Sequence, residues 1–122
     1  MHNFKELRIW NEAMSLTKVV YAHTRKFPKE EMYSLTQQIN RCAVSIPSNI
    51  AEGAGRNTKK DFKHFISIAL GSAFELETQL ILAGDLGYIS KEELETTLEK
   101  LNSLQKMTNK FSMSLEIPVS RY

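Results

Sequence analysis

The spacing of apolar residues is the feature of this sequence that most restricts its fold. Through most of the chain these residues recur every three or four positions, and no stretch alternates strictly between apolar and polar side chains. The first pattern is typical of amphipathic helices, whereas strict alternation is typical of half-buried strands. With only 5 Gly and 3 Pro in 122 residues, a turn-rich β-sandwich or barrel is disfavoured as well. The sequence therefore predicts an all-α protein.

The few glycines and prolines divide this pattern into four expected helices. Their bounds are about 6–26, 34 to 53 or 55, 58–86, and 90 to about 115. Four helices with short connections predict an antiparallel up-down-up-down four-helix bundle, in a single domain that spans residues 1–122.

Local signals refine the helix ends and one interior position. Three expected helices begin with a Ser or Thr followed three residues later by an acid or amide, which predicts a side-chain N-cap: Ser34 with Gln37, Thr58 with Asp61, and Ser90 with Glu93. Pro47 lies inside the second helix and leaves the carbonyl oxygen of Ala43 without its helical partner, so we expect a kink there and no break.

Composition places the chain among ordinary globular proteins. Hydrophobic residues make up 42% and charged residues 25%, a balance that excludes an intrinsically disordered chain. Cys42 is the single cysteine, so an intramolecular disulfide and a cysteine-based zinc site are excluded, and a reducing compartment fits. The first residues lack a signal pattern, and no uncharged apolar run approaches the ~20 residues of a membrane span. We expect a cytoplasmic protein with no membrane partner.

The third helix carries more apolar surface than a bundle requires. Leu70, Phe74 and Ile81 widen its core stripe past half of the circumference, whereas a bundle helix needs an apolar arc of about 100° or somewhat more. Either the fourth helix covers the surplus or the chain associates with itself. Glu77 lies within the widened face, where a carboxylate needs a partner or access to water.

The second helix shows a polar stripe beside its apolar one. The stripe is formed by residues three or four positions apart: Gln38, Arg41, Ser45, Asn49 and Glu52. It is either a solvated flank or a polar network at a helix–helix or subunit contact. In the second case Arg41 or Asn49 would meet a carboxylate such as Glu77 or Glu52.

No catalytic, cofactor or metal site is predicted. A di-metal carboxylate bundle needs Glu-x-x-His on two helices, and only Asp61 with His64 comes close. Because His64 falls outside the core stripe, we expect a surface histidine. Cys42 lies on the apolar stripe of the second helix and is expected to be a small buried hydrophobe.

One candidate site for an anion remains. Arg56, Lys59, Lys60 and Lys63 gather at the loop that enters the third helix, where free N–H groups and the positive helix end attract anions. Basic residues of the first helix and just after it are expected to extend the patch: Lys18, Arg25, Lys26 and Lys29. The formal net charge is only +2. The cluster is therefore either a solubilising surface or a nucleic-acid-binding patch.

The run 38–53, with its central Ser-Ile-Pro-Ser-Asn-Ile-Ala-Glu-Gly block, resembles the family of 23S rRNA intervening sequence proteins. Positions on both sides also fit that family's pattern: Trp10, Ala13, Tyr21, Phe27–Pro28, Leu35, Phe65, Ala69–Ser72, Glu75–Glu77 and Leu86–Ile89. The resemblance covers 4–89, while the fourth helix agrees only in general character. Cys42 stands where the family more often has a small residue such as alanine.

This resemblance implies a four-helix bundle that assembles as a homopentameric ring, and it implies no settled activity. A related branch, the accessory variability determinant proteins of retroelements, binds nucleic acid and a reverse transcriptase through a strongly basic pentamer. At +2 per chain, a pentamer here would carry about +10, enough for weak, salt-sensitive binding. In this context the residues Arg41, Ser45, Asn49, Glu52 and Glu77 look like assembly determinants.

The sequence thus favours a non-enzymatic homo-oligomer that binds RNA or DNA through a basic surface. The alternative is a protein-interaction scaffold or adaptor that binds no nucleic acid and has a protein partner.

Overall fold

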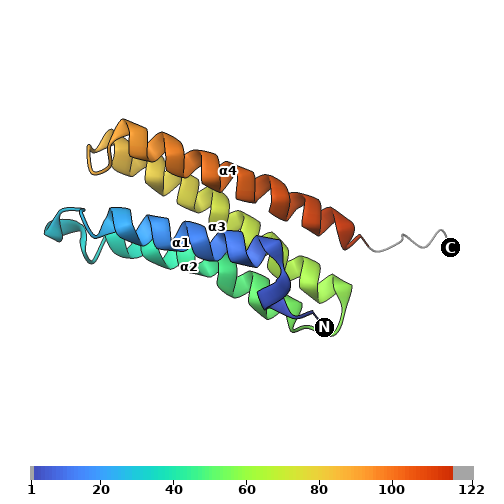
Figure 1. Cartoon of the computed structure of the whole chain (residues 1–122). Coiled ribbons are helices and arrows are strands. Elements are labelled where there is room, and N and C mark those ends of the chain that lie inside the picture. The colour runs from blue at the N-terminus through green and yellow to red at the C-terminus, as the bar shows by residue number, and fades with distance from the viewer. Residues whose placement is uncertain (1, 117–122) are drawn as a thin grey trace.

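A computed structural model of the protein describes residues 2–116. Its elements are η1 (Phe4–Glu6), α1 (Arg8–Thr24), η2 (Lys29–Glu31), α2 (Leu35–Ala54), α3 (Lys59–Asp85) and α4 (Lys91–Ser114). Consecutive helices run in opposite directions beside one another (Figure 1). The all-α prediction is confirmed, and each expected helix is present.

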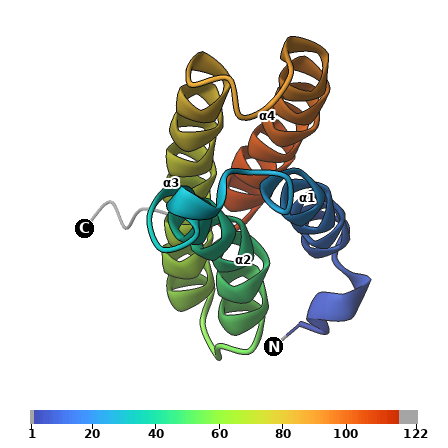
Figure 2. The same cartoon turned by 90° about the vertical axis from the view of Figure 1, so that its left-hand side faces the viewer.

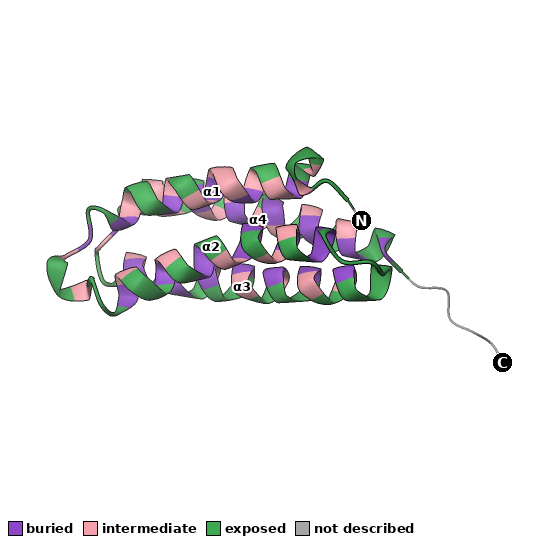
Figure 3. Ribbon diagram, turned by 90° about the horizontal axis from the view of Figure 1, so that it is seen from below, coloured by how far each residue is buried: buried purple, intermediate pink, exposed green. Residues whose placement is uncertain are grey.

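The four helices pack as neighbours around a common core. Contacts join α1 to α2, α2 to α3, α3 to α4 and α4 back to α1, with the α2–α3 contact the most extensive. Seen from the end, α1 and α3 lie on opposite sides of the bundle (Figure 2). Buried residues recur along α1, α2 and α3 (Figure 3), and the large side chains with almost no exposure include Leu16, Ile39, Ile46, Ile50, Ile66, Leu76, Leu80, Leu101 and Leu104. This arrangement is that of an up-down-up-down bundle.

A close contact between α2 and α3 is made where α2 ends. A Cβ atom placed on Gly53 would lie 2.8 Å from the Cβ of Phe65 and 2.9 Å from Cδ1 of Phe62. Only a glycine lets the backbone of α2 approach α3 this closely, because real Cβ atoms do not pack at such distances. Gly53 therefore sets the spacing of the two helices just before the chain turns into α3.

Two of the three predicted N-caps are confirmed. Thr58 Oγ1 accepts from the backbone N–H of Asp61 at 3.1 Å, and Ser90 Oγ accepts from that of Glu93 at 3.1 Å. The prediction for Ser34 is wrong. This residue has φ −126° and ψ −102°, outside the extended region that an N-cap needs, and α2 has no side-chain cap. Its hydroxyl instead donates to Glu31 Oε1 at 2.8 Å, because the turn η2 brings that carboxylate alongside.

The interior proline leaves α2 unbroken, as predicted, since helical structure continues across Pro47 from Leu35 to Ala54. The kink itself stays a prediction.

By length and composition, α3 is long and apolar enough to cross a membrane. This finding qualifies the expectation from the sequence that no uncharged apolar run approaches the length of a membrane span. The core helix of a soluble bundle has the same properties, and one stripe of α3, from Phe62 to Ala83, packs into the core of this bundle.

Candidate nucleic-acid interface

The four basic residues predicted to bind an anion lie together where α2 turns into α3, and we call Arg56, Lys59, Lys60 and Lys63 the basic turn. Lys59 and Lys60 are the first two residues of α3, directly after its N-cap Thr58, and both are exposed. A cation at this end of a helix faces the positive pole of the helix dipole, which disfavours it. Lys59 and Lys60 therefore do not stabilise α3. They add positive charge to the N-terminal end of this helix.

Two members of the basic turn are already engaged within the chain. Arg56 Nη2 pairs with Glu52 Oε1 at 2.9 Å, and its guanidinium carbon lies 4.6 Å from the ring centre of Phe65. Lys63 pairs with Glu116. Within residues 2–116, Lys59 and Lys60 form no ion pair. The free positive charge of the turn thus resides on these two lysines.

The expected extension of this patch by the first helix is wrong. Because α1 and α2 are antiparallel, the C-terminal end of α1 lies at the far end of the bundle from the basic turn (Figure 1). Arg25 and Lys29 lie at that far end, and Lys26 pairs there with Glu93 at 3.1 Å. Lys18 lies in the middle of α1.

Basic residues near the N-terminus take their place. The backbone N–H of His2 donates to the carbonyl oxygen of Ala54 at 2.8 Å, and its ring lies 5.1 Å from that of Phe62. This contact holds the N-terminal segment at the same end of the bundle as the basic turn (Figure 1). It brings Lys5 and Arg8, both exposed, to that end. Sequence reasoning missed them because their place depends on a contact between distant parts of the chain.

The polar stripe of α2 serves in part to join α2 to α3. The Oγ atoms of Ser45 and Ser72 lie 2.8 Å apart, and Asn49 Nδ2 donates to Ser45 O at 2.8 Å and to Ser45 Oγ at 3.0 Å. The thiol of Cys42 donates to Ser72 O at 3.0 Å. Ser45 and Asn49 are thus partly buried components of a helix–helix contact.

The charged residues assigned to the same network are not brought together within one chain. Glu52 pairs with Arg56, and Glu77 accepts a hydrogen bond from Gln105 Nε2 of α4 at 2.9 Å. Glu77 therefore lies on the flank of α3 that faces α4, while Arg41 lies on the outer surface of α2 and is exposed. Arg41 forms no ion pair within the described part of the chain.

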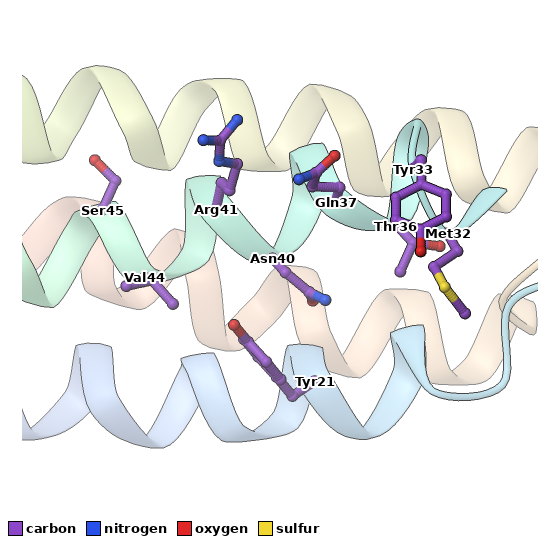
Figure 4. A pocket seen from close by; sticks show the side chains of 9 residues that line it. All are labelled: Tyr21, Met32, Tyr33, Thr36, Gln37, Asn40, Arg41, Val44 and Ser45. Atoms are coloured by element: carbon purple, nitrogen blue, oxygen red, sulfur yellow. The ribbon is translucent and has the colours of Figure 1, made fainter.

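Arg41 stands between two surface hollows. One, the α1–α2 groove, has a volume of about 610 Å³ (Figure 4), and its lining residues are Tyr21, Met32, Tyr33, Thr36, Gln37, Asn40, Arg41, Val44 and Ser45. The other, of about 270 Å³ between α2 and α3, is lined by Gln38, Arg41, Cys42, Ser45, Ser72, Glu75 and Gln79. Gln79 is buried, and its Oε1 atom has no hydrogen-bond partner in residues 2–116.

The groups that could support chemistry are few. Among residues 2–116, no three His, Cys, Asp or Glu side chains are grouped to hold a metal ion. His64 is exposed, as predicted, and its ring lies 5.6 Å from that of Phe65. Cys42 is buried, as predicted, and burial together with the charge of Glu75 raises the pKa of its thiol to about 12. A thiol held protonated in this way is a poor nucleophile.

These features define a class: an all-α bundle of four adjacent helices with a basic turn at one end. The chain belongs to the 23S rRNA-intervening sequence protein family, whose model matches residues 5–110. The chain is also similar to a crystal structure from Bacteroides thetaiotaomicron, described as a protein with unknown function from the S23 ribosomal protein family. The identity is 23% and the TM-score 0.77, and the match covers 85% of this chain and 97% of the other. Among curated proteins, none matches.

Proposed function

We propose that this protein is a non-enzymatic, cytoplasmic homo-oligomer that associates with RNA or DNA through the basic turn. The observation that carries this proposal is the position of Lys59 and Lys60 at the positive end of α3. Their charges face solvent, are unpaired within residues 2–116, and lie where they oppose the helix dipole. A bound phosphate would relieve that repulsion and accept from backbone N–H groups at the same helix end.

Self-association supports the same proposal. A single chain has a net charge of only +2, and nucleic-acid affinity depends on the number of phosphates that are contacted. A ring of copies would repeat the basic turn around an axis and sum those contacts. We propose a homopentamer, as the family resemblance implies.

Apolar surface left open by the bundle fits self-association. α4 leaves Phe74 57% exposed and Ile81 42% exposed. From the sequence, these two residues are among those predicted to widen the apolar face of the third helix. Apolar surface of this kind commonly marks an interface.

The test is fluorescence anisotropy with a labelled structured RNA and a labelled DNA duplex at several salt concentrations. Lys59→Ala/Lys60→Ala removes the two free charges without touching the pairs made by Arg56 and Lys63. The matched control is Lys29→Ala/Lys91→Ala, which removes the same charge from exposed positions at the other end of the bundle. We expect the first variant to bind at least tenfold more weakly and to reduce the salt slope by about 2 for each engaged subunit.

Equal binding by both variants would reject the basic turn as the contact surface. Absence of binding by the unmodified protein, even at low salt, would instead favour a scaffold or adaptor whose partner is a protein.

A further inference from the structure

The α1–α2 groove is a concave surface in which exposed apolar side chains lie beside neutral polar ones, with one charge at its edge. Tyr33 is 85% exposed, Met32 49%, and Val44 40%. Arg41, exposed one helical turn before Val44, lines the edge of the groove, and its guanidinium group is directed toward α3, away from Tyr21 (Figure 4). Tyr and Arg are, with Trp, the residues that are enriched among those that carry most of the binding energy at protein interfaces. The groove therefore has the chemistry of a surface that receives a partner containing apolar side chains and a carboxylate.

α3 presents a surface with the complementary features. Phe74, Glu77 and Ile81 are spaced by three and four positions, so they share one face of the helix. Phe74 and Ile81 are exposed, and Glu77 lies between them. The neighbour of this carboxylate is a neutral amide, that of Gln105 on α4. We call these three residues the α3 ridge.

The groove and the ridge lie on opposite sides of the molecule. The groove is formed by α1, α2 and the turn η2, and the ridge faces outward on the side of α4, as the hydrogen bond that Gln105 donates to Glu77 requires. Viewed from the end, the α1–α2 edge of the bundle is opposite the α3–α4 edge (Figure 2). Two different complementary surfaces on opposite sides produce head-to-tail contacts, which close into a ring when the rotation between copies allows it.

We propose that the α3 ridge of one copy occupies the α1–α2 groove of the next copy, with Glu77 placed opposite Arg41. This contact covers two exposed apolar faces at once and gives each of the two charges an ionic partner, which neither has within residues 2–116. The inference rests on the self-association proposed above and adds which surfaces of neighbouring copies meet.

Disulfide cross-linking between two differently labelled copies tests the head-to-tail geometry. In a Cys42→Ala background, one chain carries Val44→Cys and the other carries Phe74→Cys. The two chains are mixed, unfolded, refolded together and oxidised. We expect a cross-linked dimer on a non-reducing gel from the mixture and little from either chain alone. A mixture of Phe74→Cys with Lys18→Cys, an exposed position in the middle of α1, is the control and should not cross-link.

Charge reversal supplies an independent measurement. Arg41→Glu and Glu77→Lys should each lower the mass measured by light scattering at a fixed protein concentration, because each places like charges together at the contact. The double variant Arg41→Glu/Glu77→Lys should restore the mass. Arg41→Glu/Glu95→Lys, which reverses an exposed carboxylate of α4, should not restore it. Circular dichroism confirms that each variant is folded.

The outcomes separate this inference from the proposals on which it rests. A monomeric unmodified protein at micromolar concentration would overturn both the self-association and the contact. An assembled protein without cross-linking in the mixture, or with efficient cross-linking of Val44→Cys alone, would overturn the contact and leave the self-association standing. Neither measurement involves nucleic acid, so both are independent of the binding proposal.

Discussion

The hydroxyl of Thr17 on α1 lies 3.2 Å from the carbonyl oxygen of Ala43 on α2. That carbonyl is the one that would accept from residue 47 in a regular helix, and Pro47 has no N–H to donate. Thr17 Oγ1 also lies 2.8 Å from its own helical acceptor, the carbonyl oxygen of Ala13. The proline thus exposes an acceptor inside the bundle, and a side chain of the neighbouring helix reaches it.

This relationship predicts that the effects of changing Thr17 and Pro47 are coupled. Thr17→Val keeps the shape of the side chain but removes the donor, and should lower the free energy of unfolding by about 1 kcal/mol. In a Pro47→Ala background residue 47 donates to Ala43 itself, so the same change should cost measurably less. Urea unfolding of the four proteins gives the coupling energy directly. Strictly additive effects would mean that the hydroxyl of Thr17 forms no stabilising hydrogen bond with the carbonyl oxygen of Ala43.

The close approach of α2 and α3 predicts opposite effects for two glycine substitutions. Gly53→Ala would place a methyl group against Phe62 and Phe65 and should destabilise the bundle by about 1–3 kcal/mol, although alanine favours helix. Gly71 lies in α3, and apart from the adjoining residues and backbone of α3 itself, nothing lies within 4 Å of a Cβ added there. Gly71→Ala should therefore stabilise by about 0.5–1 kcal/mol. Thermal unfolding measures the stability of both variants relative to the unmodified protein. A stabilised Gly53→Ala variant would contradict the close contact between α2 and α3.

The helices could be predicted from the sequence because their signals are local. Apolar periodicity sets the length of each helix, and the caps at Thr58 and Ser90 need only residues three positions apart. The cap predicted at Ser34 failed because the backbone of that residue is determined by the preceding turn η2, which the pattern does not contain. A cap motif in the sequence shows that the side chain can accept a hydrogen bond. Whether the cap forms also depends on the backbone angles of that residue, which the preceding connecting segment determines.

The candidate sites were predictable to the extent that their members are neighbours in sequence. The basic turn spans eight positions, from Arg56 to Lys63, and folds as one unit. Lys5 was missed because a contact between His2 and Ala54 positions it. The angular positions of Arg41 and Glu77 around their own helices were predictable. A helical wheel, however, does not show which neighbouring helix each side of a helix faces. In this bundle the two residues occupy different outer faces.

The raised pKa of the Cys42 thiol predicts low reactivity in the folded protein. Burial and the charge of Glu75 raise that pKa to about 12, so very little thiolate is present at pH 8. We expect reaction with a thiol reagent such as Ellman's reagent to be at least a hundredfold slower in buffer than in denaturant. Equal rates in the two conditions would show that this part of α2 opens freely.

His23 lies in a polar contact between α1 and α4 whose contribution to stability we expect to depend on pH. Its side chain is 13% exposed; Nε2 lies 2.9 Å from Thr97 Oγ1, and Nδ1 lies 3.5 Å from Glu93 Oε2. The hydroxyl of Thr97 donates to Glu93 O at 2.7 Å, so Nε2 of His23 is the donor to Thr97. The proton taken up on acidification therefore goes to Nδ1.

Burial lowers the pKa of His23 below its ordinary value, an effect that Glu93 opposes and Lys26 reinforces. The unfolded chain, with a histidine pKa near 6.5, then binds the proton more readily than the folded protein. The free energy of unfolding should consequently decrease as pH falls through about 6.5, and continue to decrease until the lower folded pKa is passed. Glu93, whose own pKa is lowered mainly by its hydrogen bond from Lys26, acts in a more acidic range.

Urea unfolding at pH 8.0 and pH 5.5 measures this effect. The unmodified protein should be less stable at the lower pH, and His23→Gln, which keeps a donor but does not titrate, should lose most of that difference. His64→Gln is the matched control, because His64 is exposed, and it should retain the full difference. If His23→Gln and His64→Gln showed the same dependence on pH, the half-buried His23 between α1 and α4 would not be its source.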